Sequence, residues 1–577
     1  MNKRLISLLL CFLMLISVSA TGCSVFGNNS EETTGSSTVA DPDQGKAITL
    51  SWYIPCEKPV SAEDVALVEE AINKITKSKF KTQIKLHMPT LDEYYATIEG
   101  IMQARVDEEE QSQLAKDELK KALRLARAEG NTDTVAVISK FYEDHPEWVK
   151  YQETEASTDT EETVPETQLN ELGMPEIKYP EERENQLDII WLGGYDKFME
   201  YVNNDLLQRL DEQLSSTSKK LKQYIYPGAL DSVKTAGSGT YAIPNNTVIG
   251  EYTYLLLNKR LVDKYKYTPS DLTNIVKCAN FLADVKKYEP DVLPIVGEIP
   301  VTLTKYWSID PETLEINHNK FNIIGHGISD TATLGSMFNF TGVFGTNVEL
   351  ANTSDYAKQL IAIRTYKDLG YVTEYTNIAK EYAVRVVKGG GELAETYGED
   401  YYMNIIESPR ADYEDIFGSM FGVSTYTRSL KRSMEIITYL NTNSDLRNVL
   451  QYGVEDVHYE LDDEGMLHRL NNNYMMDINK TGNVFMAYPE EGMPKNVWTY
   501  GKAQNTAAKT MMTLGLRFKD EDFQSSSDPE AVNKLKAAIK AVNDYSADVE
   551  KRLNAAQSVA ELEEIMREVA RKFGTDA

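Results

Sequence analysis

The sequence predicts an α/β protein built as two lobes, and three observations support this prediction. The chain has 577 residues, of which 42% are hydrophobic, so it is long enough for two or more folding units with their own cores. Residues 47–88 have the pattern of strand, helix and strand, which opens a βαβ unit. The continuous apolar runs at 187–191 and 252–258 are typical of strands buried on both faces of a sheet.

The charge balance excludes one class of partner. The chain carries 60 Lys and Arg against 89 Asp and Glu, a formal net charge of −29. Nucleic acid is bound by basic side chains that neutralise its phosphates, so a nucleic-acid partner is not expected. Adhesion to anionic lipid by charge alone is disfavoured for the same reason.

The first segment resembles a secretory signal. Lys3 and Arg4 precede an apolar run at 5–18, and small residues follow this run. The run is shorter than the roughly 20 residues that a membrane-spanning helix needs. Residues 1–22 are therefore predicted to be a signal peptide.

The end of this signal resembles the lipobox of bacterial lipoproteins. Cys23 follows Gly22, and in that family the thiol of this Cys is acylated and becomes the mature N-terminus. Ala20 stands where the family usually has Leu. The resemblance implies a lipid anchor, with palmitate among its acyl chains, on Cys23; the alternative is ordinary secretion with a free thiol. Residues 23–46, rich in Ser, Thr, Gly and Asn, are predicted to be a flexible tether.

The remaining cysteines leave two alternatives open. Cys56 and Cys278 could form a disulfide in an oxidising compartment, or both could be buried free thiols. The His and Cys residues show no metal-ligand spacing. Neither a metal nor a cofactor is predicted.

The βαβ opening is interrupted by a charged segment. Residues 61–76 predict a helix with Ser61 as its N-cap, and residues 81–88 alternate as a strand. Residues 92–185 then predict a surface insertion, with a long helix at 92–129, a partner helix at 133–149 and an acidic loop at 152–166. This insertion could be a docking arm, but a solvated helical hairpin is favoured.

The α/β pattern resumes after the insertion. The strand at 187–191 ends in Gly193-Gly194, and Asp196 then opens an amphipathic helix. Further elements are predicted in this order: a strand at 252–258, a helical region at 271–288, an amphipathic helix at 427–440 and a helical tail at 529–573.

Several segments, taken in order, resemble one known family. They are DIIWLGGYDKF (188–198), NNDLLQRLDE (203–212), YAIPNN (241–246), LLLNKRL (255–261) and NTNSDLRNVLQYG (441–453). These segments resemble the solute-binding lipoproteins of ABC importers, in the group similar to maltose-binding protein. HYELDDEGML (458–467) and TGNVFMAYPEEGMPKNVW (481–498) are similar to a lineage of long Gram-positive members. Each motif alone is loose, so the resemblance depends on their order.

The resemblance implies a periplasmic-binding-protein type II-like fold with a helical insertion. Its lobes would comprise residues 47–248 and 411–476 for lobe 1, and residues 249–410 and 477–577, with the C-terminal helices, for lobe 2. The implied protein is a monomeric receptor without enzymatic activity, lipid-anchored on the extracellular face of the bacterial cytoplasmic membrane. It would capture a carbohydrate, expected to be an oligosaccharide, between its lobes and deliver it to the permease subunits of an ABC transporter.

Candidate ligand contacts follow from the chemistry of sugars. Aromatic rings stack on the apolar face of a pyranose, and carboxylates and amides hydrogen-bond its hydroxyls. The expected contacts are Trp52, Trp191, Tyr195, Asp196, Asn245, Asn246, Glu251, Trp307, Gly391 and Trp498. The resemblance places Asp196 and Glu251 at family acids and Gly391 at a strand-end glycine beside a sugar-stacking aromatic. The structural alternatives are core packing for the aromatics, an N-cap for Asp196 and turns for the two Asn residues.

Two other functions remain as alternatives. A secreted, lipid-anchored glycoside hydrolase would act with paired carboxylates, but a barrel enzyme would show eight βα repeats and the chain shows fewer. A structural or adhesive surface protein would not need the α/β pattern. The binding receptor is therefore the favoured interpretation.

Overall fold

The structure is a computed structural model that describes residues 45–128, 132–144, 178–235, 239–301, 306–312, 316–325, 349–350, 353–374, 380–510 and 529–573. The expected signal peptide, the lipidation site Cys23 and nearly all of the tether lie outside the described residues, as does the acidic loop at 152–166.

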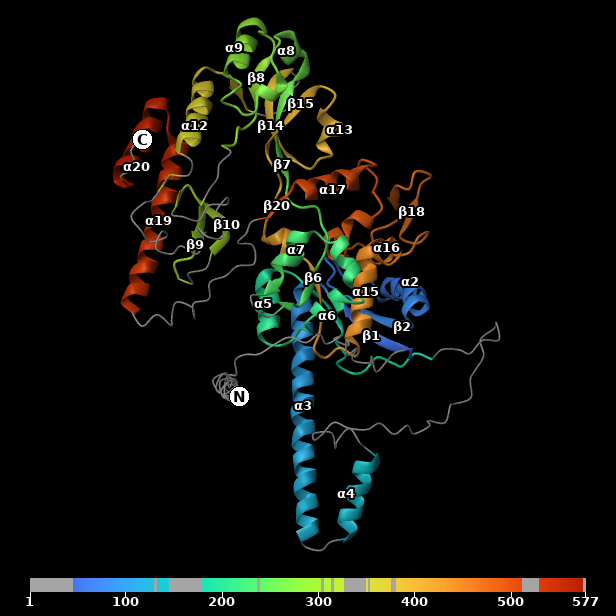
Figure 1. Ribbon diagram of the computed structural model, residues 1–577. Coiled ribbons are helices and arrows are strands. Elements are labelled where there is room, and N and C mark those ends of the chain that lie inside the picture. The colour runs from blue at the N-terminus through green and yellow to red at the C-terminus, as the bar shows by residue number, and fades with distance from the viewer. Residues whose placement is uncertain are drawn as a thin grey trace, which may run out of the picture. The chain divides into compact units, whose positions relative to one another are not determined.

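The first lobe is built on a five-stranded sheet (Figure 1). Its strands, in spatial order, are β2 (Thr82–His87), β1 (Ile48–Tyr53), β3 (Ile189–Leu192), β17 (Met420–Val423) and β6 (Ala242–Pro244). Strand β1 pairs in parallel with both β2 and β3, whereas β17 is antiparallel to both of its neighbours. The predicted βαβ opening is confirmed, with helix α2 (Ala62–Phe80) between β1 and β2.

The ends of α2 follow from local chemistry. The Ser61 hydroxyl accepts a hydrogen bond from the backbone N–H of Asp64 at 3.1 Å, so the predicted N-cap is confirmed. The helix runs past the predicted end at residue 76 to Phe80, where Lys81 adopts a left-handed conformation with φ of 49°. Val68 and Ile72 on its inner face are fully buried against the sheet.

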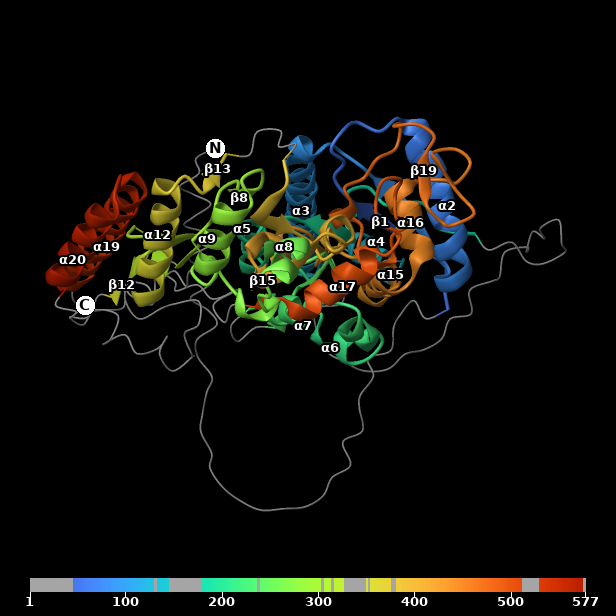
Figure 2. The ribbon, with the colours of Figure 1, turned by 90° about the horizontal axis from the view of Figure 1, so that it is seen from above.

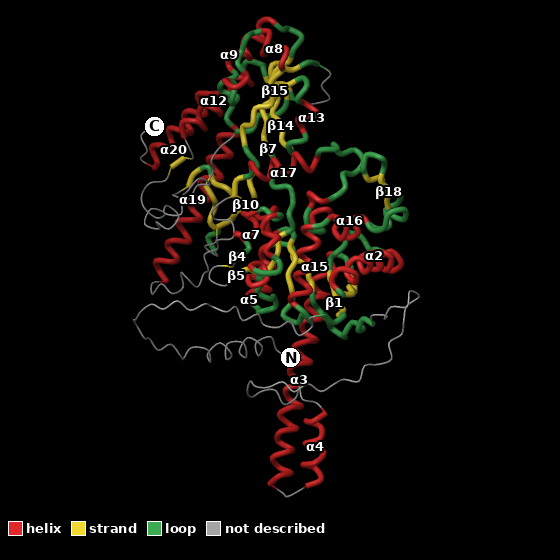
Figure 3. Tube along the Cα trace, turned by 45° about the vertical axis from the view of Figure 1, so that its right-hand side comes forward, coloured by secondary structure: helices red, strands yellow, loops and turns green. Residues whose placement is uncertain are grey.

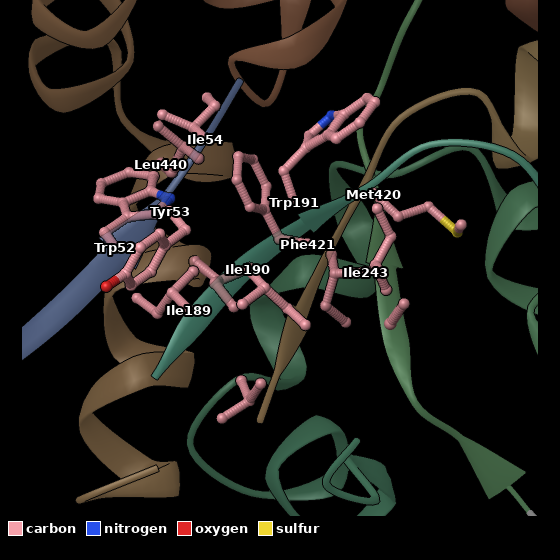
Figure 4. Close-up of a cluster of buried hydrophobic side chains, with 14 of the residues drawn as sticks. Trp52, Tyr53, Ile54, Ile189, Ile190, Trp191, Ile243, Met420, Phe421 and Leu440 are labelled. Atoms are coloured by element: carbon pink, nitrogen blue, oxygen red, sulfur yellow. The ribbon is translucent and has the colours of Figure 1, made fainter. Parts of the chain in front are cut away.

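Strands β1 and β3 are buried on both faces, as the apolar run at 187–191 predicted for β3. All six residues of β1 and all four of β3 are buried. Figure 4 shows Trp52 on β1 and Phe421 on β17 in this core, with their ring centroids 5.7 Å apart in an edge-on arrangement. Ile189, Ile190 and Ile243 surround these rings.

The long helix α3 (Leu91–Ala128) belongs to the core at its start and leaves it later (Figure 3). Tyr94, Ile98 and Met102 are buried in the core of the first lobe. Farther along, α3 packs against α4 (Thr132–Asp144), which corresponds to the predicted helical hairpin. The side chains of Glu108 and Asn185 meet at 2.7 Å.

The second lobe has its own five-stranded sheet and its own core. The strand order is β13 (Val372–Thr373), β8 (Leu293–Val296), β14 (Tyr382–Gly389), β7 (Tyr252–Asn258) and β15 (Tyr401–Glu407). Strand β7 is antiparallel to both neighbours, while β8 is parallel to β13 and β14. Leu255, Phe281 and Val384 lie in its core. Helix α9 (Ala279–Tyr288) is shorter than the predicted helical region at 271–288, because residues 272–274 form a loop and residues 275–278 a turn.

Helices also cover the second lobe. Helix α12 (Thr353–Asp368) packs against α20 (Val559–Phe573), which packs against α19 (Pro529–Ala555); Figure 2 shows the three side by side. The predicted α/β fold with two lobes and a helical insertion is confirmed. The lobe boundaries at 248/249, 410/411 and 476/477 stay predictions.

The remaining helices and strands pack around the two sheets or form their connections. The helices are α5 (Tyr195–Asn203), α6 (Asp211–Ser215), α7 (Pro227–Ser232), α8 (Lys259–Lys264), α13 (Leu393–Tyr397), α14 (Tyr413–Phe417), α15 (Leu430–Thr442), α16 (Ser444–Tyr452) and α17 (Val497–Ala507), with the short turns η2 (Lys219–Gln223), η3 (Pro269–Asp271), η4 (Ile478–Lys480) and η5 (Val484–Met486). The short strands are β4 (Lys234–Thr235), β5 (Gly239–Thr240), β9 (Tyr306–Ile309), β10 (Ile316–Asn322), β11 (Ile324–Gly325), β12 (Glu349–Leu350), β16 (Arg410–Ala411), β18 (Tyr459–Leu461), β19 (Leu467–Arg469) and β20 (Lys509–Thr510).

Candidate functional site

A cavity of about 610 Å³ lies at the carboxyl ends of the parallel strands of the first sheet. Leu91 follows β2, Gly193 follows β3 and Thr247 follows β6, while Ser419 precedes the reversed strand β17. These loops meet at one edge because the carboxyl ends of parallel strands point the same way. This edge is where open α/β sheets bind ligands, so the cavity is the candidate site.

Two tyrosines at the start of α3 fix the end of β3. The Tyr94 hydroxyl donates to the Trp191 carbonyl at 2.8 Å and accepts from the Trp191 amide at 2.8 Å. The Tyr95 hydroxyl does the same for Gly193, at 3.1 and 2.9 Å. Tyr94 is fully buried, and burial holds the pKa of its hydroxyl well above the ordinary value, so it stays protonated. Half-buried Tyr95 lines the cavity.

Trp191 joins this strand end to β17. Its indole N–H donates to the Ser419 hydroxyl oxygen at 2.7 Å, and the Asn245 amide donates to the same oxygen at 2.8 Å. The Ser419 oxygen thus accepts two hydrogen bonds, which leaves its own proton to donate elsewhere. Trp191 is only 4% exposed and therefore offers the cavity a small part of its ring. A Cβ on Gly193 would lie 2.1 Å from the Trp191 ring, so this turn requires glycine.

Carboxylates give the cavity its charge. Glu414, Asp415 and Asp477 line it. Burial raises the pKa of Asp415 to about 6. Hydrogen bonds from the backbone N–H groups of Asp412 and Gly250 stabilise the carboxylate and oppose part of this rise. The Asp477 side chain accepts from the backbone N–H of Asn479 at 2.9 Å and caps η4.

Lys480 supplies a positive charge at the same place. Its ammonium lies 5.2 Å from the centre of the Trp191 ring and pairs with the carboxylate of Glu57. Lys480 is only 8% exposed, whereas the Glu57 side chain is 41% exposed.

The segment that leaves the cavity towards the second sheet is held by helix α17. Gln504, which is 1% exposed, donates to the carbonyls of Ile249 and Gly250 and accepts from the amide of Gly391 at 3.1 Å. Asn505 accepts from the amide of Ile249 at 2.8 Å. Gly250 precedes β7 and Gly391 follows β14. The buried side-chain amide of Gln504 therefore links the connecting segment to the second sheet.

The structure brings two of the expected ligand contacts to the candidate site. Trp191 lines the cavity, and Asn245 donates a hydrogen bond to the hydroxyl of Ser419, which also lines the cavity. Asn246 instead lines a second cavity of about 630 Å³, where its side chain donates to the Tyr224 carbonyl at 2.6 Å and to Asn483 at 3.2 Å.

The other expected contacts of the first lobe lie elsewhere. Trp52 is fully buried in the core and does not line the cavity. Tyr195 packs its ring against Phe417 at 4.8 Å, and Asp196 is exposed in the first turn of α5. Glu251 is exposed just before β7.

The expected contacts of the second lobe are also dispersed. Trp307 lies on β9, and its side chain lies outside the described part. The ring of Trp498 packs edge-on against Phe485 at 6.4 Å, with its indole N–H buried and without a hydrogen-bond partner. Gly391 lies against Tyr500, whose Cβ would be 3.2 Å from an added side chain.

Sequence reasoning missed several cavity residues. Tyr95 falls within the segment assigned to the insertion, although the first turns of that helix pack into the core. Its signal was the apolar spacing of Tyr94, Ile98 and Met102. Ser419 and Lys480 carry no local signal, because only the fold brings them to the ends of β3 and β6.

Two further findings concern the described residues. They contain no helix that is long and apolar enough to cross a bilayer, and no group of three or more His, Cys, Asp or Glu side chains arranged to hold a metal ion. The structure also decides between the cysteine alternatives: Cys56 is buried in the first core and Cys278 in the second, and both are free thiols.

Comparison with known proteins reports a related sequence. No family profile matches the chain. A carbohydrate ABC transporter substrate-binding protein of Streptococcus pneumoniae is 22% identical over 402 residues, which cover 63% of this chain and 74% of that protein. The chain is similar in sequence to this ABC-transporter solute-binding protein. The resemblance of its motifs to this group is thus confirmed.

Solved structures of solute-binding proteins are also similar. An N-glycan transport solute-binding protein from Streptococcus pneumoniae is 15% identical, with 91% of this chain and 98% of that chain covered and a TM-score of 0.43. An extracellular solute-binding protein from Bifidobacterium longum subsp. infantis is 13% identical, with 92% and 98% covered and a TM-score of 0.39. Both TM-scores are below 0.5; the two lobes follow from the two separate five-stranded sheets, each with its own core.

Proposed function

We propose that this protein is an extracytoplasmic receptor that captures a carbohydrate, of oligosaccharide size, and delivers it to the permease of an ABC transporter. The observation that carries this proposal is the cavity at the carboxyl edge of the first sheet, in a chain related to a carbohydrate substrate-binding protein. A volume of about 610 Å³ lies within the usual range for small-molecule sites.

The cavity chemistry suits sugar hydroxyls. The carboxylates of Glu414 and Asp477 accept hydrogen bonds, and the free proton of the Ser419 hydroxyl can be donated. The rings of Tyr95 and Trp191 supply apolar surface for a pyranose face. We propose these five residues as ligand contacts, and we propose the lipid anchor on Cys23 as the link to the membrane.

Glycoside hydrolysis is a second candidate because of one observation. Asp415, with a pKa of about 6, has the property of a general acid, and Glu414 lies beside it in the sequence. However, the two Asp415 oxygens accept from the backbone N–H groups of Gly250 and Asp412, at 3.2 and 3.0 Å. These bonds tie the carboxyl to the turn that it stabilises, so the binding function is favoured.

A titration tests the proposal. Neutral gluco-, manno- and N-acetylglucosamine-containing oligosaccharides are added to the protein while tryptophan emission and melting temperature are followed. One of them is expected to stabilise the fold by about 2.7 kcal/mol at a hundredfold its Kd. Release of shorter sugars during incubation would instead support the hydrolase, and a panel without any binder would overturn the receptor.

Two tryptophan variants locate the ligand. Trp191→Phe is expected to weaken binding about tenfold and to reduce the ligand-induced change in emission, because Trp191 lines the cavity and its N–H holds Ser419. Trp52→Phe is the matched control: Trp52 is fully buried in the core, so this variant should lose stability but keep its affinity.

A further inference from the structure

The candidate site has an excess of negative charge that is not balanced within it. Three carboxylates, of Glu414, Asp415 and Asp477, line the cavity, and Lys480 is the cation among the lining residues that the structure describes. A charged ligand entering this site would meet these groups at short range, where partial burial weakens screening by water and salt.

The charge of Lys480 is already neutralised from outside the cavity. Its ammonium forms an ion pair with Glu57, which follows β1 and is not among the lining residues. The same ammonium lies over the Trp191 ring, at 5.2 Å from its centre, and the residue is 8% exposed. The ring and the carboxylate together hold this cation at the wall of the cavity instead of leaving it to a ligand.

We propose that Glu57 is a specificity-determining residue, which neutralises Lys480 and thereby makes the cavity select uncharged sugars over anionic ones. This inference rests on the proposed carbohydrate-binding function and adds the class of sugar. A uronic acid carboxylate in the cavity would face Glu414 and Asp477 without an available counter-charge, whereas the hydroxyls of a neutral sugar can donate to both.

The test uses pairs of sugars of matched linkage that differ only at C6, which is a hydroxymethyl group in one and a carboxylate in the other. Mannotriose is paired with trimannuronate, and galactotriose with trigalacturonate, so that each pair differs by oxidation at C6. Calorimetric titration of the wild-type protein is expected to give at least about tenfold tighter binding of the neutral member of a pair that binds. This ratio should shrink in high salt, because the repulsion is electrostatic.

Two variants test the role of Glu57. Glu57→Gln releases the Lys480 ammonium, so the ratio of neutral to anionic affinity is expected to fall at least threefold. Glu464→Gln is the matched control, since it breaks an exposed pair with Lys495 and neither residue lines the cavity. It should leave the ratio unchanged.

A third variant keeps the test independent of how well Glu57→Gln folds. If the charge of Lys480 is masked, Lys480→Gln changes the ratio by less than about threefold; if Lys480 recruits anions, uronate binding in this variant collapses. The inference is overturned by any of three results. These are such a collapse, equal binding of both sugars by the wild-type protein, and a ratio of affinities that Glu57→Gln does not change. Absence of binding by every neutral sugar tried overturns the proposed function itself.

Discussion

The hydroxyl of Tyr94 donates to the carbonyl of Trp191 and accepts from its amide, each at 2.8 Å, and so completes the backbone hydrogen bonding at the end of β3. A side chain on α3 thereby replaces a neighbouring strand at the point where the sheet opens into the cavity. The candidate site depends on this contact because Trp191 and Gly193 both line the cavity.

Removing the Tyr94 hydroxyl should therefore lower stability. Tyr94→Phe leaves the amide and carbonyl of Trp191 without their partner in a fully buried place, which costs about 1–3 kcal/mol per buried group. Urea unfolding measures this loss. Tyr95→Phe is the matched control: it breaks the equivalent pair at Gly193, but water can reach that half-buried site, so its effect should be smaller. Equal losses in both variants would contradict this account.

Gln504 is expected to hold the connection between the two lobes. Gln504→Leu leaves the amide of Gly391 and the carbonyl of Gly250 unpaired, so we expect a loss of about 1–3 kcal/mol in the free energy of unfolding and faster hydrogen exchange at Gly391. Lys502→Ala, an exposed substitution on the same helix, is the control. Unchanged exchange at Gly391 would show that the bond is not needed there.

Asp415 gives the stability a pH dependence of known sign. Because burial raises its pKa to about 6 in the folded state, its contribution is fully present below its unfolded pKa of 3.8 and is lost as the pH rises through 6. Relative to Asp415→Asn, the free energy of unfolding of the wild-type protein should fall by roughly 2 kcal/mol between pH 4 and 7. Urea unfolding at several pH values measures this slope, and Glu414→Gln should retain it.

Most of the helical insertion should be dispensable for binding. The side chains of Glu108 and Asn185 touch, so the chain leaves and re-enters the first lobe at neighbouring points. We expect that a Gly-Ser linker of about 15 residues can replace residues 109–177 with little change in melting temperature or sugar affinity. A longer excision that also removes Tyr94 and Ile98 should prevent folding, because both are buried in the core. Lost affinity in the shorter excision would assign a binding role to the segment.

Both buried cysteines should react slowly with thiol reagents. Burial raises the pKa of Cys56 and raises that of Cys278 to about 12, so little reactive thiolate is present at neutral pH. In the native protein we expect neither thiol to be modified quickly by Ellman's reagent, and in denaturant we expect both to react. A failure of these two thiols to react in denaturant without reductant would indicate a disulfide instead.

Local patterns were sufficient for several elements of this protein. The apolar runs predicted buried β3 and β7, and Ser61 with Asp64 marked the start of α2, because strand burial and helix capping depend on residues close together in the chain. The order of loose motifs was sufficient for the relationship to solute-binding proteins, which the related pneumococcal sequence confirms.

The cavity was decided only by the tertiary structure. Asp196 was expected there because the resemblance places it at a family acid, yet it is exposed on α5, whereas Tyr95, Ser419 and Lys480 reach the cavity from three distant parts of the chain. The spacing of residues along the chain predicts which face of a strand or helix each residue occupies. It does not determine which strand ends lie together in the fold. Trp191, Ser419 and Asn245 come into contact because β3 pairs with β17 and β17 pairs with β6.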